Sequence, residues 1–214
     1  MKINLPDNKL RILRALVFTL ELLALGLLLY IFILPVYPLV GYKMATTENK
    51  KISIEAKDEA IVKQKTEEYK STFPESEYAI SPNRLIITKI GVNAPIVESK
   101  NEAYGLDRGA WRVPETSTPD KGSNTVITGH RFKYLPPNNL TFYLLDKLEI
   151  GDIISVIWKE QNYYYRVKET KVVPDTELSV LNPSDKPIIT LFTCTPIYST
   201  ENRLVVVGEL MEEE

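Results

Sequence analysis

The sequence has very little of the two residue types that build most protein metal and disulfide sites. Its 214 residues include one cysteine, Cys194, and one histidine, His130. A single cysteine cannot form a disulfide within the chain. A structural zinc site with four histidine or cysteine ligands is excluded as well, because the chain has only two such side chains. From this low content of cysteine and histidine we expect no catalytic or structural metal and no cofactor.

A surplus of positive charge is also missing. The chain carries 26 Lys plus Arg against 28 Asp plus Glu, a formal net charge of −2. Such a balance provides no broad positive field for nucleic-acid phosphates, so we predict no nucleic-acid partner. The hydrophobic fraction of 44% is large enough for a real core, and 25% charged residues argues against general disorder.

One long apolar run lies near the N-terminus. Residues 15–34 are apolar apart from Glu21, and about 20 such residues carry a helix across the hydrocarbon core of a bilayer. Basic residues within 1–14 precede the run, which by the positive-inside rule predicts a cytoplasmic N-terminus. We therefore expect a cytoplasmic segment at 1–14 and a single-pass cell-membrane anchor at 15–40, with the rest of the chain outside the cell. A cleaved signal peptide is the alternative, but no small-residue cleavage site follows the run.

The remaining chain divides into two parts of different composition. Residues 41–79 are rich in charge and poor in large apolar side chains, which predicts a partly helical stalk exposed to solvent. A lid that folds over an active site is the alternative for this segment. Residues 80–214 contain seven or eight short β-branched runs, which predict a mostly β extracytoplasmic domain built as a closed barrel.

Two local features of the barrel domain can also be predicted. Phe142, Leu145 and Leu148 have helical spacing, so one or two short helices are expected among the strands. Two strand-like runs on either side of Gln161–Asn162 predict a hairpin with its turn at those residues.

Three chemically active side chains stand at the ends of predicted strands. Cys194 and Arg203 flank one short connection, so two adjacent strands can hold them side by side, whereas His130 lies far earlier in the sequence. A lone cysteine is most often a small buried hydrophobic residue, and a lone histidine or strand-end arginine usually has a structural role. Outside the cytoplasm, however, an unpaired cysteine is either inert and buried or retained for its chemistry.

The motifs around these residues resemble those of the sortases, the cysteine transpeptidases of bacterial cell surfaces. TLFTC at 190–194 is similar to the family's TLxTC signature, TGHR at 128–131 resembles the strand end that carries the catalytic histidine, and Arg203 matches the essential arginine. The resemblance covers about residues 83–210 and implies a sortase-type β-barrel. The compact, single-anchor classes D and E look most similar, because 41–79 lacks an Asp-Pro-aromatic lid motif and no second apolar segment follows the domain.

The resemblance implies a membrane-anchored transpeptidase. Cys194 would cleave an LPxTG-like sorting signal of a surface protein and hold the acyl product as a thioester. An amine of a peptidoglycan precursor or a pilin would then take up that product. The chemistry fits the residues: a thiolate is a strong nucleophile, a guanidinium such as Arg203 stabilises an oxyanion, and His130 can move protons. Thr193 is expected to contact the substrate, and 172–186 to wall the peptide groove.

Two alternatives stay open for the same residues. One is a cysteine endopeptidase that hydrolyses the thioester, and the other is a catalytically silent surface barrel that binds or scaffolds a partner. Some sortases bind calcium as a non-catalytic activator through acidic side chains near the groove. The scattered candidates for such a site, none of which we assign, are Glu115, Asp120, Glu169 and Glu177.

Overall fold

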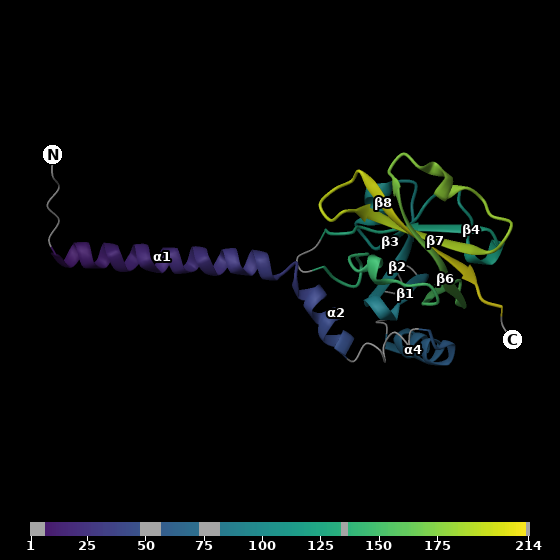
Figure 1. Cartoon of the computed structure of the whole chain (residues 1–214), viewed down its shortest axis with the longest axis horizontal. Helices are drawn as coiled ribbons and strands as arrows, with labels where there is room; N and C mark the ends of the chain where they lie inside the picture. Colours follow the sequence, from purple (N-terminus) through teal and green to yellow (C-terminus); the bar gives the residue numbers. More distant parts are fainter. Residues whose placement is uncertain (1–6, 48–56, 73–81, 134–136, 213–214) are drawn as a thin grey trace.

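A computed structural model describes residues 7–47, 57–72, 82–133 and 137–212. A long N-terminal helix stands apart from a β-barrel, and two shorter helices come between them in the sequence (Figure 1). The helices are α1 (Asp7–Ile33), α2 (Tyr37–Thr47), α4 (Glu59–Thr72) and α6 (Glu102–Leu106). The strands are β1 (Arg84–Ile87), β2 (Val92–Glu98), β3 (Ala110–Arg112), β4 (Asn124–Thr128), β5 (Ile153–Trp158), β6 (Gln161–Pro174), β7 (Ile188–Thr195) and β8 (Asn202–Leu210). Short 3-10 helices are η1 (Thr88–Ile90), η2 (Pro119–Lys121), η3 (Leu145–Lys147) and η4 (Leu178–Leu181).

The strands close into one barrel in the order β1-β2-β3-β4-β7-β8-β6-β5. Neighbouring strands are antiparallel except for two parallel pairs, β2 with β3 and β4 with β7. Successive side chains of a strand point to opposite faces, and the inward set fills the barrel, as the fully buried Ile127, Leu191 and Val206 show. The expectation of a closed, mostly antiparallel barrel with a few short helices is confirmed.

Helix α1 has the length and composition of a membrane-spanning helix over Asn8–Ile33, and none of its apolar stretch is buried within the described chain. Leu23 and Phe32 are 70% and 71% exposed. A helix of 27 residues is about 40 Å long, which exceeds the ~30 Å hydrocarbon core of a bilayer. So much exposed apolar surface is unfavourable in water, which is consistent with a membrane anchor.

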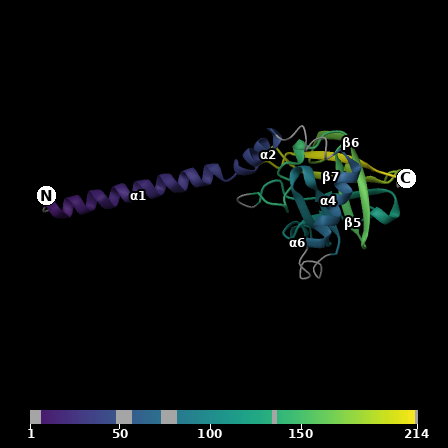
Figure 2. The same ribbon diagram turned by 90° about the horizontal axis from the view of Figure 1, so that it is seen from below.

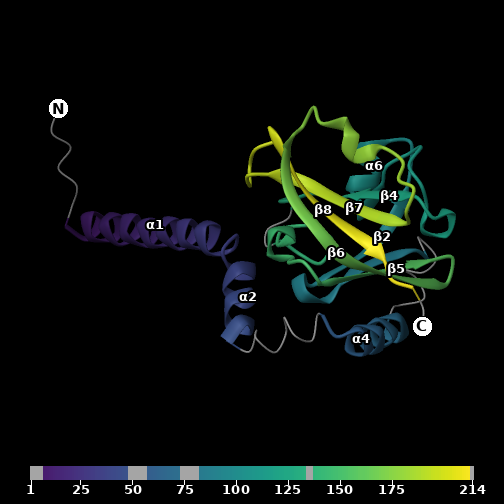
Figure 3. The same ribbon diagram turned by 45° about the vertical axis from the view of Figure 1, so that its right-hand side comes forward.

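Part of the charged segment 41–79 is packed on the barrel. Helix α4 lies beside β5 (Figures 2 and 3), with Val62 and Thr66 buried. The Thr66 hydroxyl donates a hydrogen bond to Ser155 Oγ at 3.1 Å. The two buried residues are four positions apart and therefore share one face of the helix. At α4, the segment that was expected to be a solvent-exposed stalk is instead a helix docked on the barrel. Residues 48–56 and 73–81 of the same segment lie outside the described residues.

The turn between β5 and β6 differs from its prediction. The expected turn at Gln161–Asn162 is wrong, because Gln161 already pairs with Trp158 across the hairpin. The turn residues are Lys159 and Glu160, whose φ angles are 49° and 67°. Two positive φ angles indicate a type I′ turn, which matches the twist of a hairpin but is usually marked by Asn-Gly or Asp-Gly.

The segment predicted to be helical forms only the 3-10 turn η3. Phe142, Leu145 and Leu148 are nevertheless all buried in the barrel core. Their helical spacing therefore did not specify an α-helix, because a short loop that closes one end of a barrel can bury the same positions.

Candidate active site

Cys194 and Arg203 are direct neighbours on two antiparallel strands. Cys194 lies near the end of β7 and Arg203 near the start of β8, and they are partners in the strand register. Residues that are directly opposite each other in such a pair have Cβ atoms about 4.5–5.5 Å apart. The register therefore brings the two side chains together, as their spacing around one connection predicted.

The guanidinium of Arg203 lies against the connection between β7 and β8. Its Nη1 donates to the carbonyl oxygens of Thr200 at 2.6 Å and Asn202 at 3.2 Å. Among the described residues, Nε and Nη2 have no hydrogen-bond partner. Since a guanidinium has five N–H donors in a fixed plane, Arg203 keeps donors that can meet a substrate oxygen.

The parallel neighbour β4 delivers His130 to the same end of the barrel. β4 and β7 pair in parallel as far as Phe192 on β7. Just beyond, the Thr193 hydroxyl donates to the carbonyl oxygen of Gly129 at 2.8 Å. Because the two strands run in the same direction, the next residue of each, His130 and Cys194, emerges at the same edge.

Alternation along the strands places the nucleophile and the arginine on the outer face of the barrel. Leu191 and Leu204 belong to the interior core. Cys194 is three residues after Leu191, and Arg203 is one residue before Leu204, so both point the other way. Cys194 is free and partly buried, which leaves its sulfur within reach of a ligand on this face.

Thr193 points away from that face. It is adjacent to Cys194 in β7, so its side chain projects into the barrel, where it is 1% exposed. Its hydroxyl is bound to the Gly129 carbonyl. The Thr193 side chain therefore ties the end of β4 to β7, and its contact with substrate stays a prediction.

The surroundings of His130 perturb its protonation. Burial of the ring lowers the pKa of His130 below its ordinary value, and the positive charge of Lys133 lowers it further. The negative charges of Asp107 and Glu102 act in the opposite direction. Lys133 and Asp107 are themselves an ion pair, so their effects partly cancel. A lowered pKa keeps the imidazole neutral near pH 7 and able to accept a proton.

Phe142 supports the histidine from the interior. Its backbone N–H donates to the His130 carbonyl oxygen at 2.9 Å. Its ring also occupies the space beside Gly129, where an added Cβ would lie only 3.0 Å from it. A side chain just before the histidine would therefore require the Phe142 ring to shift by a few tenths of an ångström. The helical spacing of Phe142 in the sequence gave no sign of this contact.

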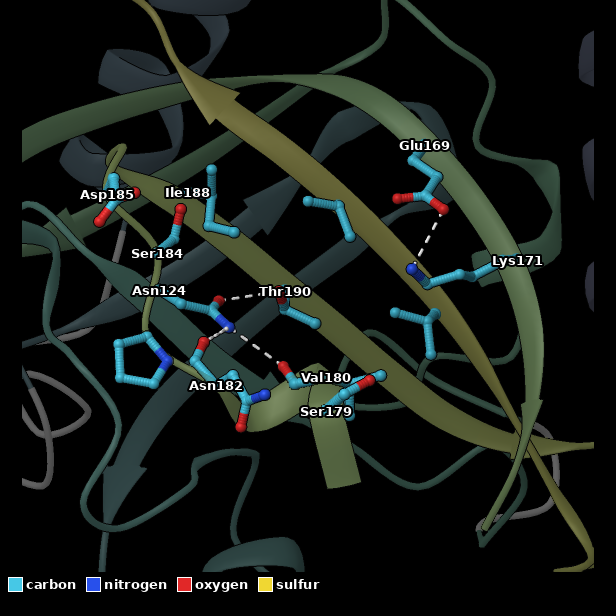
Figure 4. Close-up of a pocket in the computed structure, with 13 residues that line it drawn as sticks. Asn124, Glu169, Lys171, Ser179, Val180, Asn182, Ser184, Asp185, Ile188 and Thr190 are labelled. Atoms are coloured by element: carbon cyan, nitrogen blue, oxygen red, sulfur yellow. Dashed lines mark hydrogen bonds and ion pairs between the residues drawn. The ribbon is translucent and has the colours of Figure 1, made fainter. Parts of the chain in front are cut away.

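A pocket of about 420 Å³ lies farther along the same outer face (Figure 4). Thr190 of β7 and Val205 of β8 line one side of it, and Val180 and Asn182 of the β6–β7 connection line another. Thr190 shares its face with Cys194 and is four residues before it, which is about 13 Å along a strand. The pocket therefore has the position expected for a peptide groove that leads to the cysteine.

Asn124 joins the two sides of this pocket. Its Nδ2 donates to the carbonyl oxygens of Val180 at 3.0 Å and Asn182 at 2.9 Å, and its Oδ1 accepts from the Thr190 hydroxyl at 2.8 Å (Figure 4). The residue is 4% exposed. This network fixes the connection relative to the strands. Nothing in the sequence marks Asn124 for this role, because an asparagine at a strand start ordinarily signals a turn.

The described residues contain no group of three or more His, Cys, Asp or Glu side chains that could hold a metal ion. Two of the acidic side chains considered for calcium instead pair with lysines. Glu169 contacts Lys171 at 3.1 Å beside the pocket, and Asp120 contacts Lys159 at 2.7 Å.

Comparison with known proteins identifies the barrel. The model of the Sortase domain matches residues 85–211. Sortase SrtE1 of Streptomyces coelicolor is 35% identical over 146 residues, which cover 60% of this chain and 40% of that protein. Sortase A of Listeria monocytogenes is 32% identical over 130 residues, which cover 61% of this chain and 56% of that protein. The chain thus spans about half the length of these curated relatives.

Solved structures have the same fold. Sortase C1 of GBS Pilus Island 1 superposes with a TM-score of 0.56 at 30% identity, covering 63% of this chain and 66% of that chain. Sortase A of Listeria monocytogenes gives a TM-score of 0.55 at 28% identity, covering 62% and 88%. Relatives named A, C, D and E all match, so these comparisons do not select a class. Sequence and structure agree on the whole barrel: the chain belongs to the sortase family.

Proposed function

We propose that this protein is a cysteine transpeptidase in which Cys194, His130 and Arg203 form the catalytic site. The observation that carries the proposal is the register pairing of Cys194 with Arg203 on the outer face of the barrel, beside the strand end that bears His130. A nucleophile, a proton carrier and a fixed cation are thereby available at one edge, which is the set that acyl transfer requires.

In the first half-reaction, the Cys194 thiolate attacks the carbonyl carbon between Thr and Gly of an LPxTG-like sorting signal. A C–S bond forms as negative charge develops on the carbonyl oxygen, and the N–H donors of Arg203 stabilise that charge. When the tetrahedral intermediate collapses, the C–N bond breaks. His130, which took up the proton of the Cys194 thiol when the thiolate formed, gives that proton to the leaving amine, and a thioester on Cys194 remains.

In the second half-reaction, an amine replaces the thiol. The now neutral His130 accepts a proton from the incoming amine as its nitrogen attacks the thioester carbon. The C–S bond then breaks, a new amide forms, and the thiolate and imidazolium are restored. The lowered pKa of His130 favours the neutral form that this step needs.

The sorting signal would bind as an extended peptide in the pocket that Asn124 joins to the strands. The pocket shares its face with Cys194, and its rim carries the Glu169–Lys171 ion pair. We propose surface proteins that bear such a signal as substrates, and an amine of a peptidoglycan precursor or a pilin as acceptor. The extended conformation suits a groove floored by strands.

We further propose that 15–40 anchors the chain in the cell membrane and that 80–214 is the extracytoplasmic catalytic domain. The exposed apolar surface of α1 supports this arrangement. Lys9, Arg11 and Arg14 at its N-terminal end favour a cytoplasmic N-terminus.

Transpeptidation is tested by incubating the full chain, in detergent micelles, with a pool of LPxTG-type peptides, with and without triglycine. Mass spectrometry should detect ligated peptide only when triglycine is present, together with an acyl adduct on Cys194. Cys194→Ala should remove both signals while the far-UV circular dichroism spectrum stays the same.

The other outcomes separate the alternative functions. Cleaved acid in equal amounts with and without triglycine would identify an endopeptidase and overturn the transpeptidase proposal. A folded wild-type protein that forms no adduct with any peptide of the pool would instead favour a silent binding barrel.

A further inference from the structure

The loop that follows the catalytic histidine touches the end of the apolar helix. The Tyr143 hydroxyl donates a hydrogen bond to the Pro35 carbonyl oxygen at 2.6 Å. Pro35 is two residues beyond Ile33, where α1 ends. The barrel is therefore held directly against the point where the chain leaves the apolar helix.

Two further aromatic rings pack in series against Tyr143 and reach the rim of the active site. The ring centroids of Tyr143 and Phe132 are 5.8 Å apart, and those of Phe132 and Tyr198 are 4.9 Å apart in an edge-on arrangement. Phe132 is two residues after His130, and Tyr198 is four residues after Cys194. We call Phe132, Tyr143 and Tyr198 the aromatic rim.

Tyr198 is the member of the aromatic rim that faces outward. It is 77% exposed, more than any other large hydrophobic side chain of the described barrel, and its φ of 71° is uncommon for a residue with a side chain. A tyrosine has an apolar ring and a polar tip, so it is favoured at the boundary between lipid and water. An exposed ring at this place is stable if a membrane surface covers it.

We propose that the mouth of the active site rests on the outer surface of the bilayer, with the exposed ring of Tyr198 among the lipid headgroups. The proposal rests on the membrane anchor proposed above for α1. In three views the β7–β8 connection lies on the side of the barrel that faces α1 (Figures 1, 2 and 3). The interfacial layer on each side of the hydrocarbon core is roughly 5–7 Å thick, and the hydrogen bond to Pro35 holds the rim close to that layer.

Such a position affects which amine the thioester meets. Cys194 lies at the end of β7 and Tyr198 lies in the connection that follows it, so a thioester on Cys194 would form next to the membrane surface. An acceptor that is itself held in the membrane would then be more concentrated at the site than one free in solution.

The experiment uses the full chain reconstituted into phosphatidylcholine–phosphatidylglycerol vesicles. Tyr198→Trp introduces a fluorescent reporter of similar size, and Leu178→Trp is the matched control. Leu178 is 67% exposed, but it lies in the β6–β7 connection, on a part of the barrel farther from α1 (Figure 3). The native Trp111 and Trp158 are 8% and 2% exposed and give the background in the wild-type chain.

Lipids that carry a spin label near the headgroup should quench most of the added fluorescence of Tyr198→Trp, whose emission should also shift to shorter wavelength than that of Leu178→Trp. The control should lose little fluorescence. Equal quenching of the two variants would overturn the proposal. So would a Tyr198→Trp signal that is shielded from aqueous iodide yet unaffected by labelled lipid, because a second protein chain would then cover the rim.

Flotation of the vesicles after a carbonate wash separates the possible failures. Protein that does not float overturns the anchor and this proposal together. Protein that floats without lipid quenching overturns only the position of the rim. The peptide ligation assay, run on the same vesicles, reports independently on the transpeptidase activity.

Discussion

Two connections border the face that carries the active site, and the protein holds them in different ways. Polar side chains at the start of β4 fasten the β6–β7 connection. Asn124 makes two hydrogen bonds to this connection and one to Thr190 of β7, and Ser123 donates to the Ser184 carbonyl oxygen while accepting from its N–H. The β7–β8 connection is held instead by Arg203, which donates to the Thr200 carbonyl oxygen, and by the aromatic rim.

The difference separates two kinds of function on one face. The first connection is fixed by residues that do not touch the reacting atoms, whereas the second is fixed by a residue that we propose to be catalytic. A substitution that loosens the β6–β7 connection should therefore weaken peptide binding. A substitution in the β7–β8 connection, at Arg203, should instead slow the chemical step. Steady-state kinetics distinguish these effects, since KM and kcat respond differently to them.

The largest effect is expected from Arg203. Arg203→Ala should lower kcat by about 10²–10³, because loss of one donor to a developing oxyanion costs that much in other acyl-transfer enzymes. Arg203→Lys keeps the charge but loses the planar set of donors, so it should recover only part of the rate. Single-turnover formation of the acyl adduct on Cys194 measures the step directly.

A matched control for the arginine is Arg112→Lys. Arg112 pairs with Glu98 through two of its nitrogens on β3 and β2, at another part of the barrel, and its substitution should leave kcat unchanged. A full rate in Arg203→Lys would contradict the idea that the guanidinium geometry matters and would reduce Arg203 to a general positive charge.

A smaller effect is expected from the other connection. Asn124→Ala removes the hydrogen bonds to Val180, Asn182 and Thr190 and leaves their polar atoms without these partners, which costs about 1–3 kcal/mol. The released wall should raise KM for the peptide roughly tenfold, which corresponds to 1.4 kcal/mol of binding free energy, with kcat nearly unchanged. Peptide titrations in the ligation assay measure both constants.

Asn101→Ala controls for a general loss of stability. Asn101 caps α6 by accepting a hydrogen bond from the Tyr104 N–H, and loss of such a cap costs about 1 kcal/mol. This variant should lower the melting temperature but leave KM at its wild-type value. If both asparagine variants raised KM equally, the network at Asn124 would have no specific part in holding the peptide.

Features that depend on short stretches of sequence could be predicted. The alternating β-branched runs indicate strands regardless of the topology of the fold. Cys194 and Arg203 flank a connection short enough to bring them together on adjacent strands. The barrel and the convergence of these two residues follow from such local patterns. His130 required the resemblance to a known family, because nothing in the spacing shows that β4 pairs with β7.

Features that depend on contacts between distant residues could not be predicted in this way. Asn124 acquires its role only when the connection 175–187 folds back over it, 56 or more residues later in the chain. The docking of α4 depends on Val62 and Thr66, two positions in a helix where half of the other residues are charged. By contrast, the inward direction of Thr193 follows from simple alternation along β7, a pattern that the sequence itself contains.

The smallest expected effect concerns His130, the proposed proton carrier. Since the chain has one histidine, its ring protons give a single titrating signal by NMR in the full chain in micelles. Lys133→Gln removes a positive charge that lowers the pKa of His130, so this substitution should raise that pKa. Asp107→Asn removes a negative charge that raises the pKa of His130, so this substitution should lower that pKa.

Shifts in opposite directions would show that the two members of the ion pair act on the ring independently. Shifts in the same direction would mean that each substitution mainly changes the burial of the ring, which is the first cause of its lowered pKa, and electrostatic tuning by this pair would then be excluded.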